Sequence, residues 1–209
     1  MKISLTKAGK RFNRDWIFRN FSFEFTEGNA YAITGPNGSG KSTLLQVIGG
    51  SIMLSEGKVN YEVPEESFYR HMSITAPYLD VIEELTAYEF LSFHAQFKPF
   101  IESVTVQSMI EKVGLVKSAH KQIRYFSSGM KQRVKLVQAI FSNVPCVLLD
   151  EPCTNLDAEG IALYQQLVKE FCGGRMVIVS SNDEQEYGFC KERTIWRSEE
   201  RRVGKECRS

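Results

Sequence analysis

Hydrophobic and polar residues alternate through the first thirty residues of the chain. The alternation is clear at residues 2–5, 16–18 and 21–25. Since successive side chains of a strand point to opposite faces of a sheet, this pattern predicts β-strands with one buried face. Residues 30–34 form a short apolar run that ends in a glycine-rich turn, which is typical of a fully buried strand. The chain is therefore expected to begin with a β-rich region.

The next segments mix one helix with two strands. Residues 43–48 are typical of a helix, which Gly49 and Gly50 end. Residues 58–61 and 73–75 are predicted to be strands.

The middle third of the chain changes character. Leu85 and Thr86 open a helical run with apolar residues at helical spacing, and residues 105–113 give another. We expect a helical subdomain at about residues 80–135, inserted between the two halves of a sheet domain.

Helices and strands alternate again in the remainder. Residues 128–141 and 158–171 are predicted helices, and residues 147–149 and 176–179 are apolar runs of strand length. Such alternation favours an α/β fold, with a mostly parallel sheet covered by helices on both faces.

Composition narrows the class of protein. The chain has 209 residues, which suits one domain, and 43% of them are hydrophobic, enough for a buried core. Its 26 basic and 25 acidic residues leave a net charge of +1, which argues against a nucleic-acid partner. The five cysteines show no CxxC spacing and are expected to be reduced thiols.

Neither end of the chain carries a membrane signal. No stretch approaches the ~20 apolar residues of a membrane span, and the first residues lack the apolar block of a signal peptide. We therefore expect a cytoplasmic chain, whose membrane role, if it has one, depends on a partner.

Residues 197–209 are abruptly charged and resemble a translated sequencing adapter, so we expect a non-native tail there.

A phosphate-binding motif follows the strand at residues 30–34. The pattern GxxxxGK[ST] is formed by Gly35, Pro36, Asn37, Gly38, Ser39, Gly40, Lys41, Ser42 and Thr43. Glycines let such a loop turn its N–H groups toward phosphates, and the helix that follows adds the positive end of its dipole. Lys41 is expected to reach the β- and γ-phosphates of ATP, and Ser42 to offer a hydroxyl ligand to Mg²⁺.

Two carboxylates end the apolar strand at residues 147–149. Ligands bind at the carboxyl ends of strands in open α/β sheets, so Asp150 and Glu151 are placed for catalysis. Asp150 is expected to hold Mg²⁺, and Glu151 to orient and deprotonate the attacking water.

These motifs occur together with Phe126-Ser127-Ser128-Gly129-Met130-Lys131-Gln132-Arg133, and with Thr154-Asn155-Leu156-Asp157. In this order they resemble the ATP-binding subunits of ABC transporters over residues 1–196. The resemblance implies a P-loop NTPase core with an N-terminal antiparallel β subdomain and an inserted helical subdomain. Haem-export-like and ABC-2-type exporters are the simple systems that such a small chain resembles.

The resemblance also implies a mechanism shared by two subunits. ATP would lie between the phosphate loop of one subunit and Ser127 and Gly129 of the other, which contact the γ-phosphate in trans. The second subunit would be an identical or a related ATPase, and a separate transmembrane permease would receive the motion at the cytoplasmic face of the membrane. The adenine is expected to stack on Phe12, with Trp16 as a competitor.

Three segments depart from the family pattern. Ser128 and Met130 replace family residues in the signature segment, and Pro77 falls where the family has a glutamine. Asn182 takes the place of the switch histidine, and asparagine can donate to a phosphate oxygen but cannot carry a proton. We therefore expect ATP hydrolysis to occur slowly. A soluble ABC ATPase acting on a protein complex, or an ATP-gated clamp, are the alternatives.

Overall fold

The computed structural model describes residues 1–64, 67–190 and 192–195, and its chain forms two sheets. The first sheet is antiparallel, with strand order β2-β1-β4. Its strands are β1 (Lys2–Phe12), β2 (Asp15–Thr26) and β4 (Glu56–Tyr61). The segments expected at residues 16–18 and 21–25 are one continuous strand, because register shifts against β1 absorb the break in the alternation. The predicted N-terminal antiparallel β region is confirmed.

The second sheet has the order β5-β6-β7-β3-β8, and its paired strands are parallel. The strands are β3 (Ala30–Thr34), β5 (Met72–Thr75), β6 (Cys146–Asp150), β7 (Met176–Ser180) and β8 (Glu192–Ile195). Because all of them run the same way, the chain segments that follow β3, β5, β6 and β7 meet at one edge of the sheet. The expected parallel α/β architecture is confirmed.

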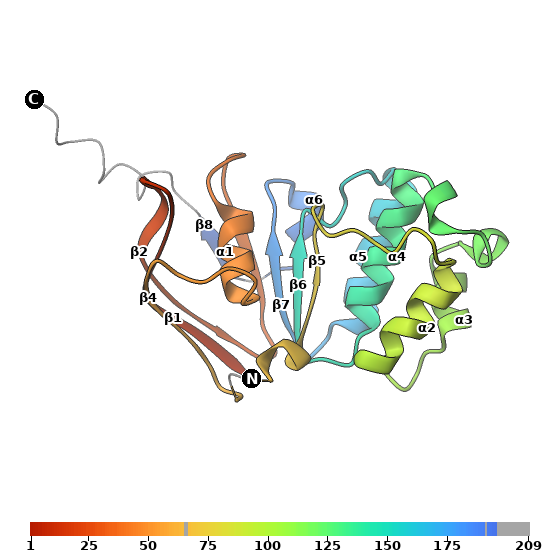
Figure 1. Cartoon of the computed structure of the whole chain (residues 1–209), viewed down its shortest axis with the longest axis horizontal. Coiled ribbons are helices and arrows are strands. Elements are labelled where there is room, and N and C mark those ends of the chain that lie inside the picture. The colour runs from red at the N-terminus through yellow and green to blue at the C-terminus, as the bar shows by residue number, and fades with distance from the viewer. Residues whose placement is uncertain (65–66, 191, 196–209) are drawn as a thin grey trace, which may run out of the picture.

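Two hydrophobic cores lie on opposite faces of the parallel sheet (Figure 1). Helix α1 (Lys41–Ile48) packs between the two sheets, while α4 (Ser128–Phe141) and α5 (Ala158–Phe171) cover the other face. Strand β6 contributes side chains to both cores. Leu148 points toward α1, and its neighbours Val147 and Leu149 point toward α4 and α5. Both faces are therefore buried, as the apolar strand sequences predicted.

The helical region lies beside α4, at the right of Figure 1. It contains α2 (Ala87–Phe97), α3 (Val106–Lys112) and the short 3₁₀ helices η2 (Val116–Ser118) and η3 (Ile123–Tyr125), whereas η1 (Phe68–His71) precedes β5. Thr86 and Glu89 form a capping box that fixes the start of α2. Thr105 is the N-cap of α3, so this helix is slightly shorter than the expected 105–113.

Besides the three 3₁₀ helices, two short elements were not predicted: α6 (Glu184–Tyr187) and β8. Each has only four residues, which is too few to show a periodic pattern.

Four cysteines are buried free thiols, namely Cys146, Cys153, Cys172 and Cys190. Cys207 and the tail at 197–209 lie outside the described residues. Within the described ranges, the helices are all too short or too polar to cross a membrane.

Candidate functional site

The phosphate loop connects β3 to α1 at the carboxyl end of the parallel sheet. Gly38 and Gly40 have φ angles of 75° and 98°, in the left-handed region that side chains disfavour. The amide of Ser39 donates to the carbonyl of Pro36 at 3.1 Å, which closes the loop. The two glycines therefore allow a tight turn that leads directly into the first turn of α1.

Lys41 is the first residue of α1 and is buried, with 5% of its surface exposed. Its Nζ donates to the carbonyl oxygens of Gly35 at 2.8 Å and Pro36 at 3.2 Å. These two bonds hold the ammonium group inside the loop, and a lysine has one further donor to offer. The positive end of the α1 dipole lies at the same place, so the loop favours an anion.

A cavity of about 230 Å³ opens beside this loop. Its lining residues come from the loop, from the start of α1, from β2 and from the residue that follows β6: Ile17, Asn37, Gly38, Gly40, Lys41, Ser42, Thr43 and Glu151. The fold thus brings Glu151 to the phosphate loop. Ile17 was not predicted, because its pattern in β2 is indistinguishable from that of a core residue.

Asp150 ends β6 and is 1% exposed, and neither of its carboxylate oxygens has a hydrogen-bond partner within normal geometry. Burial raises the pKa of Asp150, while the nearby hydroxyls of Ser180 and Ser42 oppose the rise. A buried carboxylate left without partners beside a hydroxyl matches the oxygen donors that Mg²⁺ prefers. Ser42 and Asp150 therefore fit the predicted metal ligands.

Glu151 has a φ of 42°, a left-handed conformation that is uncommon for a residue with a side chain. Its amide donates to the carbonyl of Ser180 in the neighbouring strand β7 at 2.9 Å. This backbone conformation turns the chain away from the direction of β6 directly after the strand ends. Such local strain is often found at functional positions.

Asn182, which follows β7, also reaches the phosphate loop. Its Nδ2 donates to Oδ1 of Asn37 at 3.0 Å, across 145 residues of sequence. The contact exists because β7 lies between β6 and β3 in the sheet. The expected switch position is thus next to the phosphate loop.

The structure does not bring Ser127 and Gly129 to the same cavity. Ser127 is the N-cap of α4 and accepts a hydrogen bond from the amide of Met130. A Cβ on Gly129 would lie 3.0 Å from the carbonyl oxygen of Asn155, so this glycine allows α4 to approach the loop after β6 closely. The Met130 side chain packs against the core, as suits a hydrophobic residue at this position.

The two candidate adenine-stacking residues differ in their surroundings. Phe12 ends β1 and is 46% exposed, with the Lys10 ammonium 4.9 Å from its ring centre. Trp16 stacks with the guanidinium groups of Arg11 and Arg19, at 5.6 Å and 4.6 Å. Phe12 is therefore the more accessible ring, although it does not line the cavity at the loop.

Pro77 lies just beyond β5, and its carbonyl accepts a hydrogen bond from Lys135 of α4 at 3.4 Å. The next residue, Tyr78, is close enough to Asp150 for that carboxylate to influence its phenol. Burial raises the pKa of Tyr78, a hydrogen bond with Gln46 opposes the rise, and the charge of Asp150 adds to it. Sequence reasoning missed Tyr78 as a neighbour of the site.

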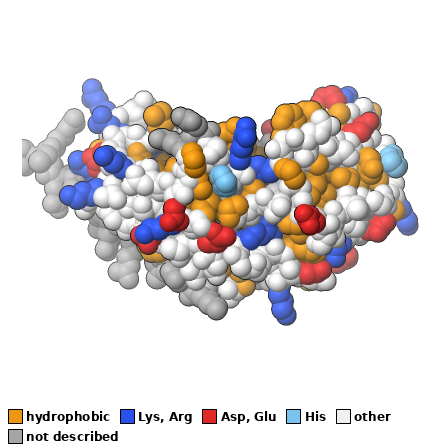
Figure 2. All heavy atoms as spheres, turned by 90° about the horizontal axis from the view of Figure 1, so that it is seen from below, with side chains coloured by type: hydrophobic (Ala, Val, Ile, Leu, Met, Phe, Trp, Pro, Cys, Tyr) orange, Lys and Arg blue, Asp and Glu red, His pale blue; other side chains and the backbone are white. Residues whose placement is uncertain are grey.

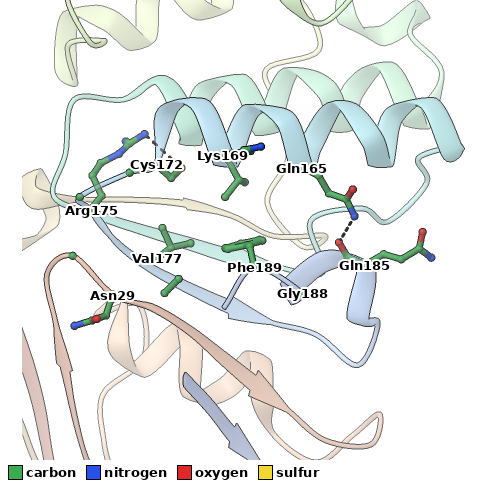
Figure 3. Close-up of a pocket in the computed structure, with 14 residues that line it drawn as sticks. Asn29, Gln165, Lys169, Cys172, Arg175, Val177, Gln185, Gly188 and Phe189 are labelled. Atoms are coloured by element: carbon green, nitrogen blue, oxygen red, sulfur yellow. Dashed lines mark hydrogen bonds between the residues drawn. The ribbon is translucent and has the colours of Figure 1, made fainter. Parts of the chain in front are cut away.

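A larger cavity, of about 510 Å³, lies between α5, α6 and the start of β7 (Figure 3). Asn29 and Val177 line it at the amino ends of β3 and β7, which is the edge of the sheet opposite the phosphate loop. None of the residues predicted to bind nucleotide or metal lines this cavity.

Comparison with known proteins agrees with this geometry. A chain with these motifs at the carboxyl edge of such a sheet is an ATP-binding cassette ATPase. The sequence profile of the ABC transporter family matches residues 18–154, and the chain belongs to that family.

Two curated relatives and one solved structure illustrate the match. The ABC transporter ATP-binding protein YybJ of Bacillus subtilis is 28% identical over 88% of this chain and 87% of its own length. The cytochrome c biogenesis ATP-binding export protein CcmA of Rhizobium johnstonii is 34% identical over 81% and 82%. The dimeric ATP-binding cassette MJ0796 bound to ADP and Pi has the same fold, with a TM-score of 0.80 and 23% identity over 92% of this chain and 93% of that one.

Proposed function

We propose that this chain is the ATP-hydrolysing subunit of a multi-subunit ABC transporter, in which Mg-ATP joins two cassettes head to tail. The observation that carries the proposal is the convergence at one cavity of Lys41, Ser42 and Glu151, with the unpartnered carboxylate of Asp150 beside them.

Each group has a role that follows from its chemistry. Lys41 and the loop amides bind the β- and γ-phosphates, Glu151 orients and deprotonates the attacking water, and Asn182 donates to a phosphate oxygen. The Ser42 hydroxyl and the Asp150 carboxylate would hold Mg²⁺, which neutralises phosphate charge when bound.

The other half of the site comes from a second cassette. Ser127 and Gly129 lie at the N-terminus of α4, a helix of 14 residues, and they are absent from the lining of the cavity. Their hydroxyl and amide groups, together with the helix dipole, suit a γ-phosphate presented by a partner chain. The exposed ring of Phe12 is proposed to stack on the adenine of the ATP bound to its own chain.

An aromatic surface is the proposed docking site for the permease. Tyr69 of η1 is 53% exposed, and Phe93 and Phe97 of α2 are 45% and 72% exposed. Lys98 joins the two elements by donating to the carbonyl of Tyr69 at 3.2 Å. Figure 2 views this end of the molecule and shows hydrophobic side chains gathered across its centre. Phe90, by contrast, is buried in the core of the helical region.

Hydrolysis is proposed to be slow and gated by closure of the two cassettes. Pro77 offers no side-chain donor, and Asn182 reaches less far than a histidine and carries no proton. We would measure single-turnover cleavage of ATP in the wild type and in Glu151→Gln and Asn182→His. The wild type should cleave slowly, Glu151→Gln at least about 100-fold more slowly, and Asn182→His faster. A wild type as inert as Glu151→Gln would mean an ATP-gated clamp without catalysis.

Fractionation tests the transporter assignment. The chain should co-sediment with membranes through a permease, and Phe97→Asp should release it while ATP binding stays intact. Wild-type protein that remains in the supernatant, in a complex with water-soluble proteins, would favour the alternative of a soluble ABC ATPase.

A further inference from the structure

The turn that follows Glu151 is held from outside by two buried side chains that sequence reasoning did not single out. Glu151 itself occupies a left-handed conformation, with a φ of 42°. The amide of Thr154 donates to the carbonyl of Glu151 at 3.1 Å, so residues 151–154 form a turn. A residue with a side chain keeps such a conformation only where its surroundings hold it there.

Glu186 of α6 provides the first contact. It is 4% exposed, and its Oε1 accepts a hydrogen bond from the amide of Cys153 at 2.7 Å. The hydroxyl of Tyr164 donates to the carbonyl oxygen of Glu186 at 2.7 Å, which fixes the residue in place. Burial raises the pKa of Glu186, and the hydroxyl of Ser181 opposes the rise. A carboxylate is costly to bury. The hydrogen bond that Glu186 accepts from the Cys153 amide therefore indicates a specific role for this side chain in the turn.

Gln132 of α4 provides the second contact. It is 3% exposed, and its Nε2 donates to the carbonyl oxygen of Pro152 at 2.7 Å. Glu186 and Gln132 thus bind opposite sides of one peptide group, between Pro152 and Cys153: Glu186 accepts from its N–H, and Gln132 donates to its carbonyl oxygen. They come from different helices, and α4 is the helix that begins at Ser128, next to the proposed γ-phosphate contacts.

We propose that Glu186 and Gln132 are positioning residues for Glu151, which lock the turn so that the Glu151 carboxylate stays directed at the attacking water. The proposal rests on the role of Glu151 given above. Neither side chain lines the cavity at the phosphate loop, so both act through the backbone of the turn. Without these bonds the backbone at Glu151 relaxes toward negative φ, and the carboxylate moves away from the loop.

The test compares Glu186→Ala, Glu186→Gln and Gln132→Leu in the full chain. Glutamine keeps an oxygen that can accept the Cys153 N–H, so Glu186→Gln should hold the turn while Glu186→Ala should not. Single-turnover cleavage should fall about 10- to 100-fold in Glu186→Ala and Gln132→Leu, with the Kd for Mg-ATP within about twofold of the wild type. Glu186→Gln should cleave within about threefold of the wild type. Gln165→Ala is the control, because it removes another link to α6, at the carbonyl of Gln185, without touching the turn.

Hydrogen exchange of the Cys153 amide gives a readout that does not depend on activity. Exchange should rise in Glu186→Ala and stay low in Glu186→Gln and Gln165→Ala. Unchanged exchange or full activity in folded Glu186→Ala would overturn the proposal, and so would a Glu186→Gln variant as impaired as Glu186→Ala. A Glu151→Gln variant as active as the wild type would instead defeat the proposed role of Glu151, whatever the exchange result.

Discussion

The two edges of the parallel sheet differ in how their polar groups are satisfied. At the amino edge, beside the cavity of about 510 Å³, the Arg175 guanidinium donates to the carbonyls of Ile140 at 2.7 Å, Ser142 at 3.0 Å and Phe171. At the carboxyl edge, beside the cavity of about 230 Å³, both oxygens of Asp150 are buried without a hydrogen bond. The unpartnered carboxylate therefore lies next to the smaller cavity, whose lining includes the neighbouring residue Glu151.

This difference indicates that unpaired polar groups, and not cavity size, mark the candidate site of this protein. Native proteins pair nearly all of their buried polar groups, so an unpaired carboxylate indicates a position that a ligand completes. Arg175 donates to carbonyls at the ends of α4 and α5, and these bonds suit a structural role. Substitutions at the two edges should accordingly separate stability from ATP binding.

The largest effect on stability is expected from Arg175→Ala at the amino edge. The substitution leaves three carbonyl groups without their donor, and the free energy of unfolding should fall by about 2–4 kcal/mol. Denaturation in urea measures the loss, and Arg175→Lys should lose less because an ammonium can still serve one or two of the carbonyls. The Kd for Mg-ATP of the folded fraction should not change, and a weakened affinity would contradict the separation of the two edges.

Lys41→Ala should give the converse result at the carboxyl edge. Loss of the ammonium group should weaken Mg-ATP binding by about 10- to 100-fold, since hydrogen bonds to charged groups contribute about 1.5–3 kcal/mol. The unfolding free energy should fall by less than in Arg175→Ala, because two carbonyls rather than three lose their donor. Isothermal titration calorimetry provides the Kd, and a variant that binds as tightly as the wild type would refute the proposed phosphate site.

Asp150→Asn should abolish Mg²⁺-dependent cleavage of ATP and make the folded chain more stable. Burial raises the pKa of the Asp150 carboxyl above its ordinary value of 3.8, so the unfolded chain ionises first and the folded state loses stability as pH rises through that window. Asparagine does not ionise, so at neutral pH the variant should unfold at a higher urea concentration than the wild type. The gain should disappear below pH 3.8, while Mg²⁺-dependent cleavage of ATP should be lost at neutral pH. Equal stability of the two proteins at neutral pH would show that the carboxylate is not penalised by burial.

His94 should make the stability of the amino edge depend on pH. Its Nε2 lies 3.1 Å from the hydroxyl of Ser142, whose carbonyl accepts from Arg175. Burial, and to a smaller extent the charge of Lys98, lowers the pKa of His94 from 6.5 to about 4. The stability that neutral His94 provides is complete above pH 6.5 and is lost as pH falls to about 4. The midpoint of thermal unfolding should follow this trend, and His94→Gln should be less sensitive over the same range.

Much of the fold and part of the site could be predicted because the signals are local. The buried strands and the longer helices repeat hydrophobic residues with a clear period, and the phosphate loop is contiguous between Gly35 and Thr43. The four-residue elements α6 and β8 have no such period and were missed. Ile17, Tyr78 and Glu186 were missed for a different reason, because their importance comes from neighbours distant in the sequence.

The sequence by itself determined the chemistry: a glycine loop with Lys41, a hydroxyl at Ser42, and two carboxylates at the end of an apolar strand. The tertiary structure decided which of these groups meet. The order β6-β7-β3 brings Asn182 within hydrogen-bond distance of Asn37. Asp150 is buried without a hydrogen-bond partner, whereas Ser127 does not line the cavity. Strand order depends on long-range pairing and on the packing of both sheet faces, and neither is encoded in the local spacing of residues.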